Sequence, residues 1–259
     1  MDDAVIYGFG VVGKATAKAF SIRHYFDIKE ANIGLNEASK KRYHFFCLPT
    51  PTINGHCFID LIVELIRQLE QIPHNQNVYI IRSTVIPGTS RFLQSSLNVN
   101  AIVSNPEFLT EATAEEDARN PDIVVIGGDH KQYVDDVKGV YEGHIKTARI
   151  FTTDSITAEM AKYAINTFYA TKVIFANAIF DQCQKIGANY ETIKEAMYSR
   201  KWIGKNHLDV WHKGGRGVNG KCLEKDLDAF ENYSKSKLLE AVRKLNDEYL
   251  SKYPKKESV

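Results

Sequence analysis

A cysteine stands where a glycine-rich loop gives way to a helical pattern. In the segment GRGVNGKCLEKDLDAF (215–230), Cys222 precedes Asp226 by four positions. A sulfur in the first turn of a helix lies at the positive end of the helix dipole, and Lys221 and Lys225 add positive potential, which favours the thiolate. Asp226, one turn later, is placed to orient a water molecule or accept a proton. From these residues alone, Cys222 is either a nucleophile or an ordinary residue of a polar turn.

An ammonium and an amide lie four positions apart in a long helical pattern further upstream. These are Lys162 and Asn166, with Glu159 one turn earlier. Residues at this spacing project from one face of a helix. An ammonium beside an amide can stabilise a developing oxyanion. By pattern alone, a solvated surface position remains the simpler interpretation of both.

A glycine turn opens the chain. The apolar strand pattern Ala4–Tyr7 leads into G-x-G-x-x-G at Gly8, Gly10 and Gly13, and a helical pattern follows. Such glycines let the backbone approach a pyrophosphate, which the helix N-terminus then binds. Asp27 ends the next strand pattern 19 positions after Gly8, where a carboxylate accepts hydrogen bonds from a ribose and favours NAD over NADP. The alternative is a glycine turn in a non-binding protein, with Asp27 merely solvated.

Apolar, β-branched runs alternate with helical patterns downstream of this turn. Strands are expected within 43–49, 77–84, 101–105, 123–128 and 148–152, and helices over 58–72, 88–97 and 132–141. This alternation predicts an α/β fold with a Rossmann-like, doubly wound parallel sheet that helices cover on both faces. Ligands of such sheets lie beyond the carboxyl ends of the strands, where the segments CLPTPT, RSTVIPGT and SNPEFLTE fall.

The second half is expected to form an all-helical domain with a long central helix. That helix should run over 156–184, from an N-cap at Asp154 or Ser155 to a stop at Gly187. Shorter helices are expected over 190–198 and, with breaks, from about residue 222 to 250. The resulting domains are an NAD-binding Rossmann domain, 1–153, and a helical domain, 154–259. Because FYATKVIFANAIF is apolar around most of the central helix, we expect a homodimer built on that helix.

Composition excludes several classes of partner. The 259 residues carry a formal charge of +1, which gives no reason to expect nucleic acid or an anionic membrane. No apolar run approaches a membrane span, and no leader pattern opens the chain. The cysteines show no metal-binding spacing, so we expect reduced thiols in a cytoplasmic protein with no bound metal.

Six motifs follow one another along the chain: GFGVVG, CLPTP, RSTVIPGT, SNPEFLTEATAEEDARNPD, AEMAKYAIN and GRGVNGKCLEKDL. In this order they resemble the UDP-glucose/GDP-mannose dehydrogenase family, whose members oxidise the C6 alcohol of a nucleotide sugar to a carboxylate with two NAD. The resemblance implies that the first hydride transfer gives an aldehyde, that Cys222 attacks it, and that a second transfer leaves a thioester for water to hydrolyse.

The resemblance also implies roles for individual residues, by motif position. The catalytic set is Cys222, Lys162 and Asn166 as oxyanion donors, and Asp226, Thr84 and Glu107 acting on the attacking water. Residues near the cofactor would be Gly8, Gly10, Val11, Val12, Gly13, Asp27, Pro49, Thr50, Thr84, Glu111 and Lys225. Residues near the sugar would be Glu107, Phe108, Leu109, Lys162, Asn166, Trp211, Gly214, Gly215 and Gly217, within the segments 108–111 and 211–217.

The chain departs from the family pattern in several places. It stops soon after EAVRKLNDEYL, so the family's further C-terminal nucleotide-binding domain is not expected in it, and the crossover after Asp27 is about a dozen residues long, barely enough for a parallel connection. Val218 and Asn219 replace Phe-Gly, Glu224 replaces a proline, and Trp202 stands where an arginine is expected. Two alternatives therefore stay open: a single-step hydroxyacid-type dehydrogenase, and a non-catalytic NAD- or sugar-binding remnant.

Overall fold

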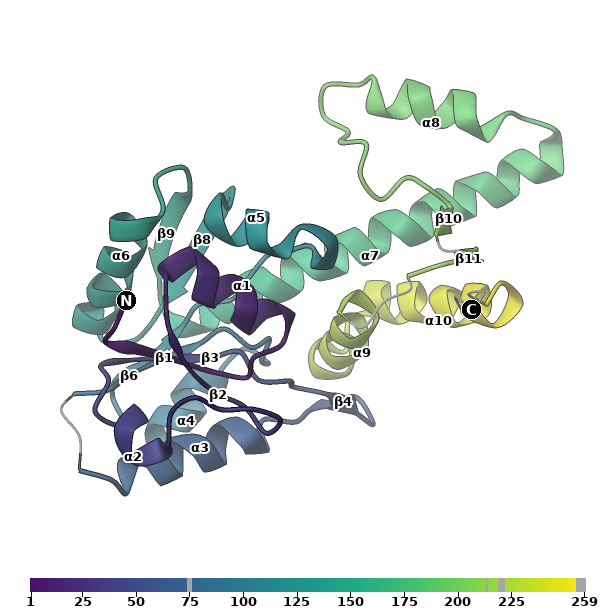
Figure 1. The fold of residues 1–259 in the computed structure, drawn as a ribbon. Coiled ribbons are helices and arrows are strands. Elements are labelled where there is room, and N and C mark those ends of the chain that lie inside the picture. The colour runs from purple at the N-terminus through teal and green to yellow at the C-terminus, as the bar shows by residue number, and fades with distance from the viewer. Residues whose placement is uncertain (74–75, 213, 219–221, 255–259) are drawn as a thin grey trace. The chain divides into compact units, whose positions relative to one another are not determined.

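The chain forms two compact units (Figure 1). The computed structural model describes residues 1–73, 76–212, 214–218, 222–254. The first unit comprises Met1–Pro51 and Cys57–Lys162, and the second comprises Thr52–His56 and the residues from Tyr163 onward. The domain boundary near residue 153 stays a prediction.

A seven-stranded sheet forms the centre of the first unit. Its strands, in spatial order, are β2 (His24–Phe26), β1 (Ala4–Tyr7), β3 (Tyr43–Phe46), β6 (Val78–Ile81), β7 (Ile102–Ser104), β8 (Ile123–Gly127) and β9 (Arg149–Thr153). Because β2 and β3 flank β1, the strand order reverses beside β1, which is where doubly wound sheets bind their ligands.

The sheet is mostly rather than wholly parallel. All neighbouring strands run parallel except β7 and β8, which meet antiparallel at Ser104 and Gly127. An antiparallel neighbour needs no crossover helix across the sheet. The short helix between these strands, α5 (Ala114–Arg119), packs instead on α1 (Val11–Phe20) through Ala15 and Ala118. The expected α/β fold is confirmed, with this one antiparallel neighbour pair as the correction.

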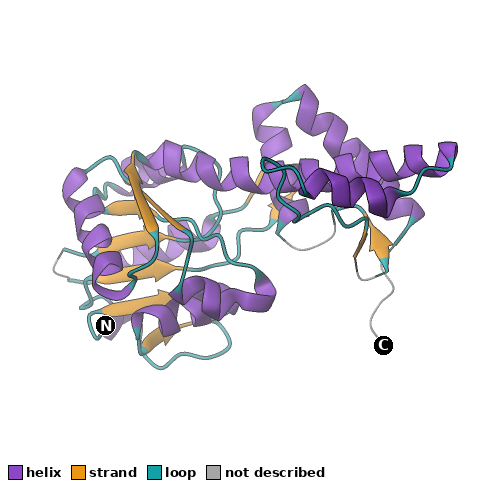
Figure 2. Cartoon of the chain, turned by 90° about the horizontal axis from the view of Figure 1, so that it is seen from above, coloured by secondary structure: helices purple, strands orange, loops and turns teal. Residues whose placement is uncertain are grey.

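Helices cover both faces of the sheet, as Figure 2 shows. Each face of the sheet has its own hydrophobic core, because successive side chains of β1 point to opposite faces. Ala4 and Ile6 join the core under α1 and α6 (Lys131–His144), whereas Val5 and Tyr7 join the core under α3 (Asp60–Glu70) and α4 (Thr89–Leu97). Two shorter elements complete the unit: α2 (Leu35–Ala38), the only helix between β2 and β3, and the 3₁₀ turn Glu111–Thr113.

The long helix α7 (Ser155–Ile186) confirms the expected central helix. The Asp154 carboxylate accepts a hydrogen bond from the backbone N–H of Thr157, as expected of an N-cap. Gly187 has φ +72°, and the Ala188 N–H bonds back to the Cys183 carbonyl, which ends the helix. Its 32 residues correspond to about 48 Å at 1.5 Å per residue.

The rest of the second unit is helical with two small hairpins. The helices are α8 (Tyr190–Tyr198), α9 (Leu223–Ser234) and α10 (Lys237–Lys252). The hairpins, which the sequence patterns did not predict, are β4 (Thr52–Ile53) with β5 (His56–Cys57), and β10 (Trp211–His212) with β11 (Gly215–Arg216). None of the described helices combines the length and apolar character that a membrane span requires.

Candidate active site

The glycine turn after β1 has the geometry of a dinucleotide site. Gly8 has φ +88°, and a Cβ there would lie 2.5 Å from the Cys47 carbonyl oxygen. A Cβ on Gly13 would lie 2.0 Å from the Gly8 oxygen, so both positions require glycine. Around Gly10 the space is open, and no side chain caps the helix that begins at Val11. The free N-terminus of α1, which also contains Val12, therefore suits a pyrophosphate.

The carboxylate of Asp27 lies beside this turn at the end of β2. Its oxygens accept hydrogen bonds from the backbone N–H of Phe9, at 2.7 Å, and of Lys29, at 3.0 Å. These backbone hydrogen bonds, that of Lys29 first, hold the pKa of Asp27 below its ordinary value. The residues therefore fit an NAD whose adenosine ribose reaches an ionised Asp27.

The ends of two neighbouring parallel strands bring together further residues of the first unit. Pro49 and Thr50 follow β3, and Thr84 follows β6. The Thr50 hydroxyl donates to the Thr84 carbonyl at 2.7 Å, so these two segments are hydrogen-bonded. Glu111 begins the 3₁₀ turn and is exposed.

Lys162 is buried in an ion pair rather than solvated. Its side chain is 6% exposed, and its ammonium donates to the carbonyl and the carboxylate of Glu107, at 2.7 and 3.1 Å. The second carboxylate oxygen of Glu107 accepts from the Leu109 N–H, and the Phe108 ring centroid lies 5.5 Å from the ammonium. The solvated interpretation of Lys162 is wrong, because Glu107 compensates its charge.

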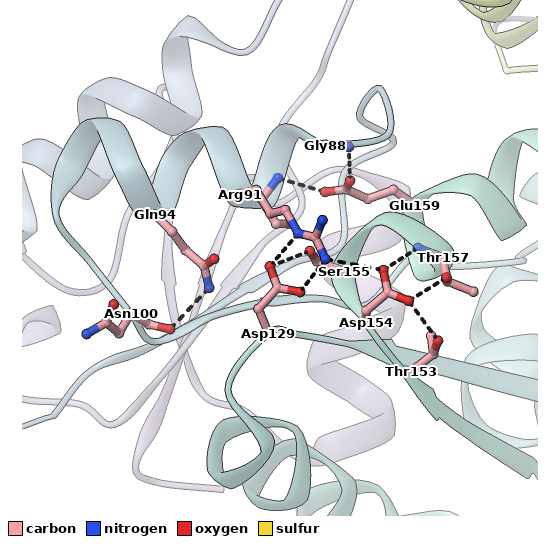
Figure 3. Close-up of polar contacts among 11 residues, drawn as sticks. Gly88, Arg91, Gln94, Asn100, Asp129, Thr153, Asp154, Ser155, Thr157 and Glu159 are labelled. Carbon is pink, nitrogen blue, oxygen red and sulfur yellow. Dashed lines mark hydrogen bonds and ion pairs between the residues drawn. The ribbon is translucent and has the colours of Figure 1, made fainter.

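Glu159, one turn before Lys162 in the same helix, contacts the start of α4 rather than Lys162 or Asn166. Its carboxylate is buried and accepts from the backbone N–H groups of Gly88 and Ser90, at 2.6 and 2.8 Å, where α4 begins (Figure 3). Burial raises the pKa of Glu159, although these hydrogen bonds oppose the shift. It therefore caps α4, a role that no local pattern revealed because its partners lie about 70 positions away.

A second group of predicted residues meets within the second unit. The Asn166 amide donates to one oxygen of Asp226, and the Lys225 ammonium donates to the other, each at 2.6 Å. Asn166 and Asp226 are buried, so the solvated interpretation of Asn166 is also wrong. Burial of a carboxylate requires such partners.

Cys222 is exposed and occupies the N-cap position of α9. Its carbonyl accepts from the Asp226 N–H at 2.9 Å, which places the carboxylate one helical turn after the thiol. The helix expected to start here is confirmed, although it is interrupted at Lys235, where φ is +52°. Lys221, which the sequence places beside the thiol, lies outside the described residues.

The expected sugar loop forms the β10–β11 hairpin. Trp211 is 52% exposed, and Gly215 is buried in β11. Gly214 and Gly217 have φ +78° and +91°, and a Cβ on Gly217 would lie 2.8 Å from the Asn246 side-chain oxygen. Lys213 is outside the described residues.

A buried arginine anchors this hairpin and was missed by the sequence analysis. Arg216 is 1% exposed and donates to the Asn177 side chain at 2.9 Å and to Asp181 at 2.8 Å. The rings of Tyr249 and Tyr253 lie within 5 Å of its guanidinium carbon. An arginine inside a glycine-rich run was the available signal, but its partners are distant in sequence.

Two family models match the chain in order. The NAD binding domain of the UDP-glucose/GDP-mannose dehydrogenase family matches residues 28–145, and the central domain of the same family matches residues 156–248. A Rickettsia felis protein named UDP-glucose 6-dehydrogenase is 32% identical over 230 residues, which cover 85% of this chain and 50% of that protein. This chain thus spans about half the length of the curated relatives it matches.

Solved structures show the same fold. A UDP-glucose dehydrogenase from Pyrobaculum islandicum matches with a TM-score of 0.82 and 23% identity, over 96% of this chain and 68% of that one. A 3-hydroxyisobutyrate dehydrogenase from Mycobacterium tuberculosis matches with a TM-score of 0.74 and 13% identity, over 97% and 94% of the two chains. The family's NAD binding domain and the glycine turn make NAD the cofactor. By its two matched domains, the chain belongs to the UDP-glucose/GDP-mannose dehydrogenase family.

Proposed function

We propose that this chain oxidises the C6 alcohol of a nucleotide sugar, a UDP-glucose-like substrate, to the carboxylate in two NAD-dependent steps. Relatives named UDP-glucose 6-dehydrogenase support the substrate class. The observation that carries the mechanism is the exposed Cys222 thiol at the start of α9, one turn before the buried Asp226. A single-step alcohol oxidation has no use for a thiol at that position.

The first oxidation needs groups that accept a proton and stabilise charge on oxygen. NAD, held at the glycine turn and by Asp27, supplies the hydride acceptor for both oxidations. The Lys162 ammonium and the Asn166 amide stabilise the negative charge that builds on the C6 oxygen as its proton leaves. Both donors already bond a carboxylate, Glu107 and Asp226, so each is held in a fixed orientation.

The second oxidation requires a tetrahedral carbon, which Cys222 provides. Its sulfur bonds to the aldehyde carbon to give a thiohemiacetal, and loss of a second hydride leaves a thioester. Water then adds to the carbonyl carbon, and the carbon–sulfur bond breaks to release the carboxylate and the thiolate. Asp226, Thr84 and Glu107 orient this water and take its proton.

The remaining residues position the ligands in this proposal. Pro49, Thr50, Glu111 and Lys225 lie near the cofactor, and the segments 108–111 and 211–217 line the sugar site. We further propose that the protein acts in the cytoplasm. We also propose that it forms a homodimer, because α7 leaves large apolar side chains exposed.

The stoichiometry of NADH tests the proposal. UDP- and GDP-sugars are incubated with the protein and NAD, and NADH release is followed together with product analysis. Our proposal expects a carboxylate and two NADH per sugar. One NADH with an aldehyde or ketone would instead identify a single-step hydroxyacid-type dehydrogenase, and binding without turnover would identify a non-catalytic remnant.

A further inference from the structure

The segment that leads into the proposed nucleophile is held by an amide side chain of α10. The Asn246 oxygen accepts a hydrogen bond from the Val218 N–H at 2.6 Å, and the Asn246 amide nitrogen donates to the Val218 carbonyl at 3.2 Å. Both residues are 1% exposed. A buried backbone N–H and a buried carbonyl each need a partner, and one planar side-chain amide supplies both. We call these two hydrogen bonds the Asn246–Val218 pair.

The surroundings of this pair show that α10 and the segment 215–218 approach each other closely. Gly217 has φ +91°, and a Cβ there would lie 2.8 Å from the Asn246 side-chain oxygen and 3.2 Å from the Cβ of Tyr249. Asparagine is also a poor residue for a helix interior, and Asn246 lies well inside α10. The backbone that it binds therefore explains its presence there, whereas helix preference does not.

The Cys222 thiol lies between this pair and the first turn of α9. Cys222 follows Val218 by four positions, which span at most about 14 Å in a fully extended chain. On the other side, the Cys222 carbonyl accepts from the Asp226 N–H at 2.9 Å, and the Asp226 carboxylate accepts from Asn166 at 2.6 Å. The position of Val218 therefore limits where the sulfur can lie.

We propose that Asn246 is a positioning residue for Cys222. Its two hydrogen bonds to Val218 hold the preceding backbone, so that the sulfur stays at the start of α9, where it can attack the aldehyde carbon. This inference rests on the proposed function, which makes Cys222 the nucleophile. Asn246 itself touches neither the sulfur nor the substrate in this proposal.

The hairpin before Val218 has an anchor of its own. The Arg216 N–H bonds to the Tyr253 carbonyl at 3.2 Å, and the Arg216 guanidinium donates to Asp181 at 2.8 Å. In the proposed function this hairpin lines the sugar site. Loss of the Asn246–Val218 pair should therefore disturb the attack by the thiol more than the binding of the sugar.

The isosteric variant Asn246→Asp tests the pair. An ionised carboxylate accepts from the Val218 N–H but cannot donate to the Val218 carbonyl, whereas a protonated carboxyl group does both. Burial favours the protonated form of the new carboxyl group. The charged groups around it are Arg243 and Asp247 of α10, Glu224, Lys225 and Asp228 of α9, and Arg216 of β11.

The rate of Cys222 alkylation by iodoacetamide, followed by mass spectrometry of the Cys222 peptide, reports on the thiol without any substrate. We expect the rate in Asn246→Asp to be about threefold below that of the parent chain at neutral pH, because a displaced sulfur loses the field of the helix N-terminus. The ratio of the two rates should rise toward one as the pH falls. Because loss and recovery are measured on the same variant, misfolding does not account for them.

Asn232→Asp is the matched control, since it makes the same change in α9, ten positions after Cys222. It removes a hydrogen bond that Asn232 donates to the Gly55 carbonyl at 2.8 Å, and its ratio to the parent chain should stay near one at every pH. A ratio for Asn246→Asp that does not change with pH would overturn the proposal.

Single-turnover kinetics then locate the effect within the reaction. In Asn246→Asp at neutral pH, formation of the second NADH should slow by on the order of 10- to 100-fold, because a small displacement of a reacting group has a large effect on rate. The first NADH and the KM for the sugar should change less. Equal losses in both oxidations would assign Asn246 to general packing and overturn the proposal.

The two proposals can fail separately. If the alkylation ratio recovers at acid pH but no nucleotide sugar is oxidised, the proposed function fails and the effect of Asn246 on the thiol stands. If the sugar is oxidised to the acid with two NADH, and Asn246→Asp changes neither alkylation nor the second oxidation, the role of Asn246 fails and the function stands.

Discussion

At the scale of single residues, each proposed oxyanion donor is already bonded to an acid of the site. Lys162 donates to Glu107 in the first unit, and Asn166 donates to Asp226 in the second. A substrate oxygen that gains negative charge therefore competes with a carboxylate for each donor. The carboxylates in turn compensate the charge of Lys162 and orient the amide of Asn166.

Replacement of the thiol should separate the two oxidations. We expect Cys222→Ser to stop the reaction before acid formation, with an intermediate trapped or released, because a serine alkoxide is far less accessible than a thiolate at neutral pH. Rapid-quench product analysis with NADH counting measures this. Acid formation with two NADH at a near-normal rate in this variant would show that Cys222 is not the nucleophile.

Removal of the ammonium should damage both oxidations. Lys162→Ala removes one of the two proposed donors to the same oxygen in each step, and the loss of one such donor typically costs about 100- to 1000-fold in rate. Single-turnover rates of the first and second NADH formed give the two effects separately. A loss confined to one step would contradict a shared oxyanion site.

Asp27 should set the choice of cofactor. An ionised carboxylate at this position repels a 2′-phosphate, and its lowered pKa keeps it ionised at neutral pH. We expect NAD to bind the parent chain more tightly than NADP. In the Asp27→Asn variant, the difference in affinity between NAD and NADP should be smaller. Titration of both cofactors against both proteins measures it. Tighter binding of NADP by the parent chain would refute the assignment and direct attention to Lys29.

At the scale of elements, the sequence predicted the residues that end α7 but not the residue that caps α4. Asp154 and Gly187 act through hydrogen bonds to their own neighbours, so their residue types predict the helix ends. Glu159 caps α4 from another helix, and the two-residue strands of the hairpins are too short for any periodicity. Local rules thus predicted the strands of the large sheet and the longer helices. The short helices α2 and α5, the antiparallel pairing of β7 with β8 and the contacts between distant segments required the structure.

The buried carboxyl group of Glu159, which caps α4, should make the free energy of unfolding depend on pH. Because burial raises the pKa of Glu159, the folded protein keeps this proton to a higher pH than the unfolded chain does. The contribution of Glu159 to the free energy of unfolding is therefore fully present below the ordinary glutamate pKa of about 4.3 and is lost as the pH rises through the raised value. Relative to Glu159→Gln, the parent chain should lose stability over this range.

Denaturant titrations of both proteins at several pH values measure this difference. Glu142→Gln, on the exposed surface of α6, is the matched control, and its difference from the parent chain should stay within about 0.5 kcal/mol. A difference between the parent chain and Glu159→Gln that does not change with pH would contradict the role of burial.

At the scale of the whole molecule, exposed aromatic residues of α7 predict self-association. Phe168 and Phe175 are 61% and 51% exposed and lie seven positions apart, on one face of the helix. A second copy of the chain could bury this face. We expect light scattering at micromolar concentration to give a dimer, and Phe168→Asp with Phe175→Asp to give a monomer. A monomeric parent chain would refute this prediction.

The β4–β5 hairpin has a consequence for the order in which the protein can be made. Thr52 bonds to the Lys225 carbonyl and Gly55 to Asn232, partners 173 and 177 positions later in the chain. At a synthesis rate of about 5–20 residues per second, these partners follow the hairpin by on the order of ten seconds or more. A ribosome-bound chain therefore presents the hairpin long before its binding surface exists. The second unit can close only once α9 has emerged.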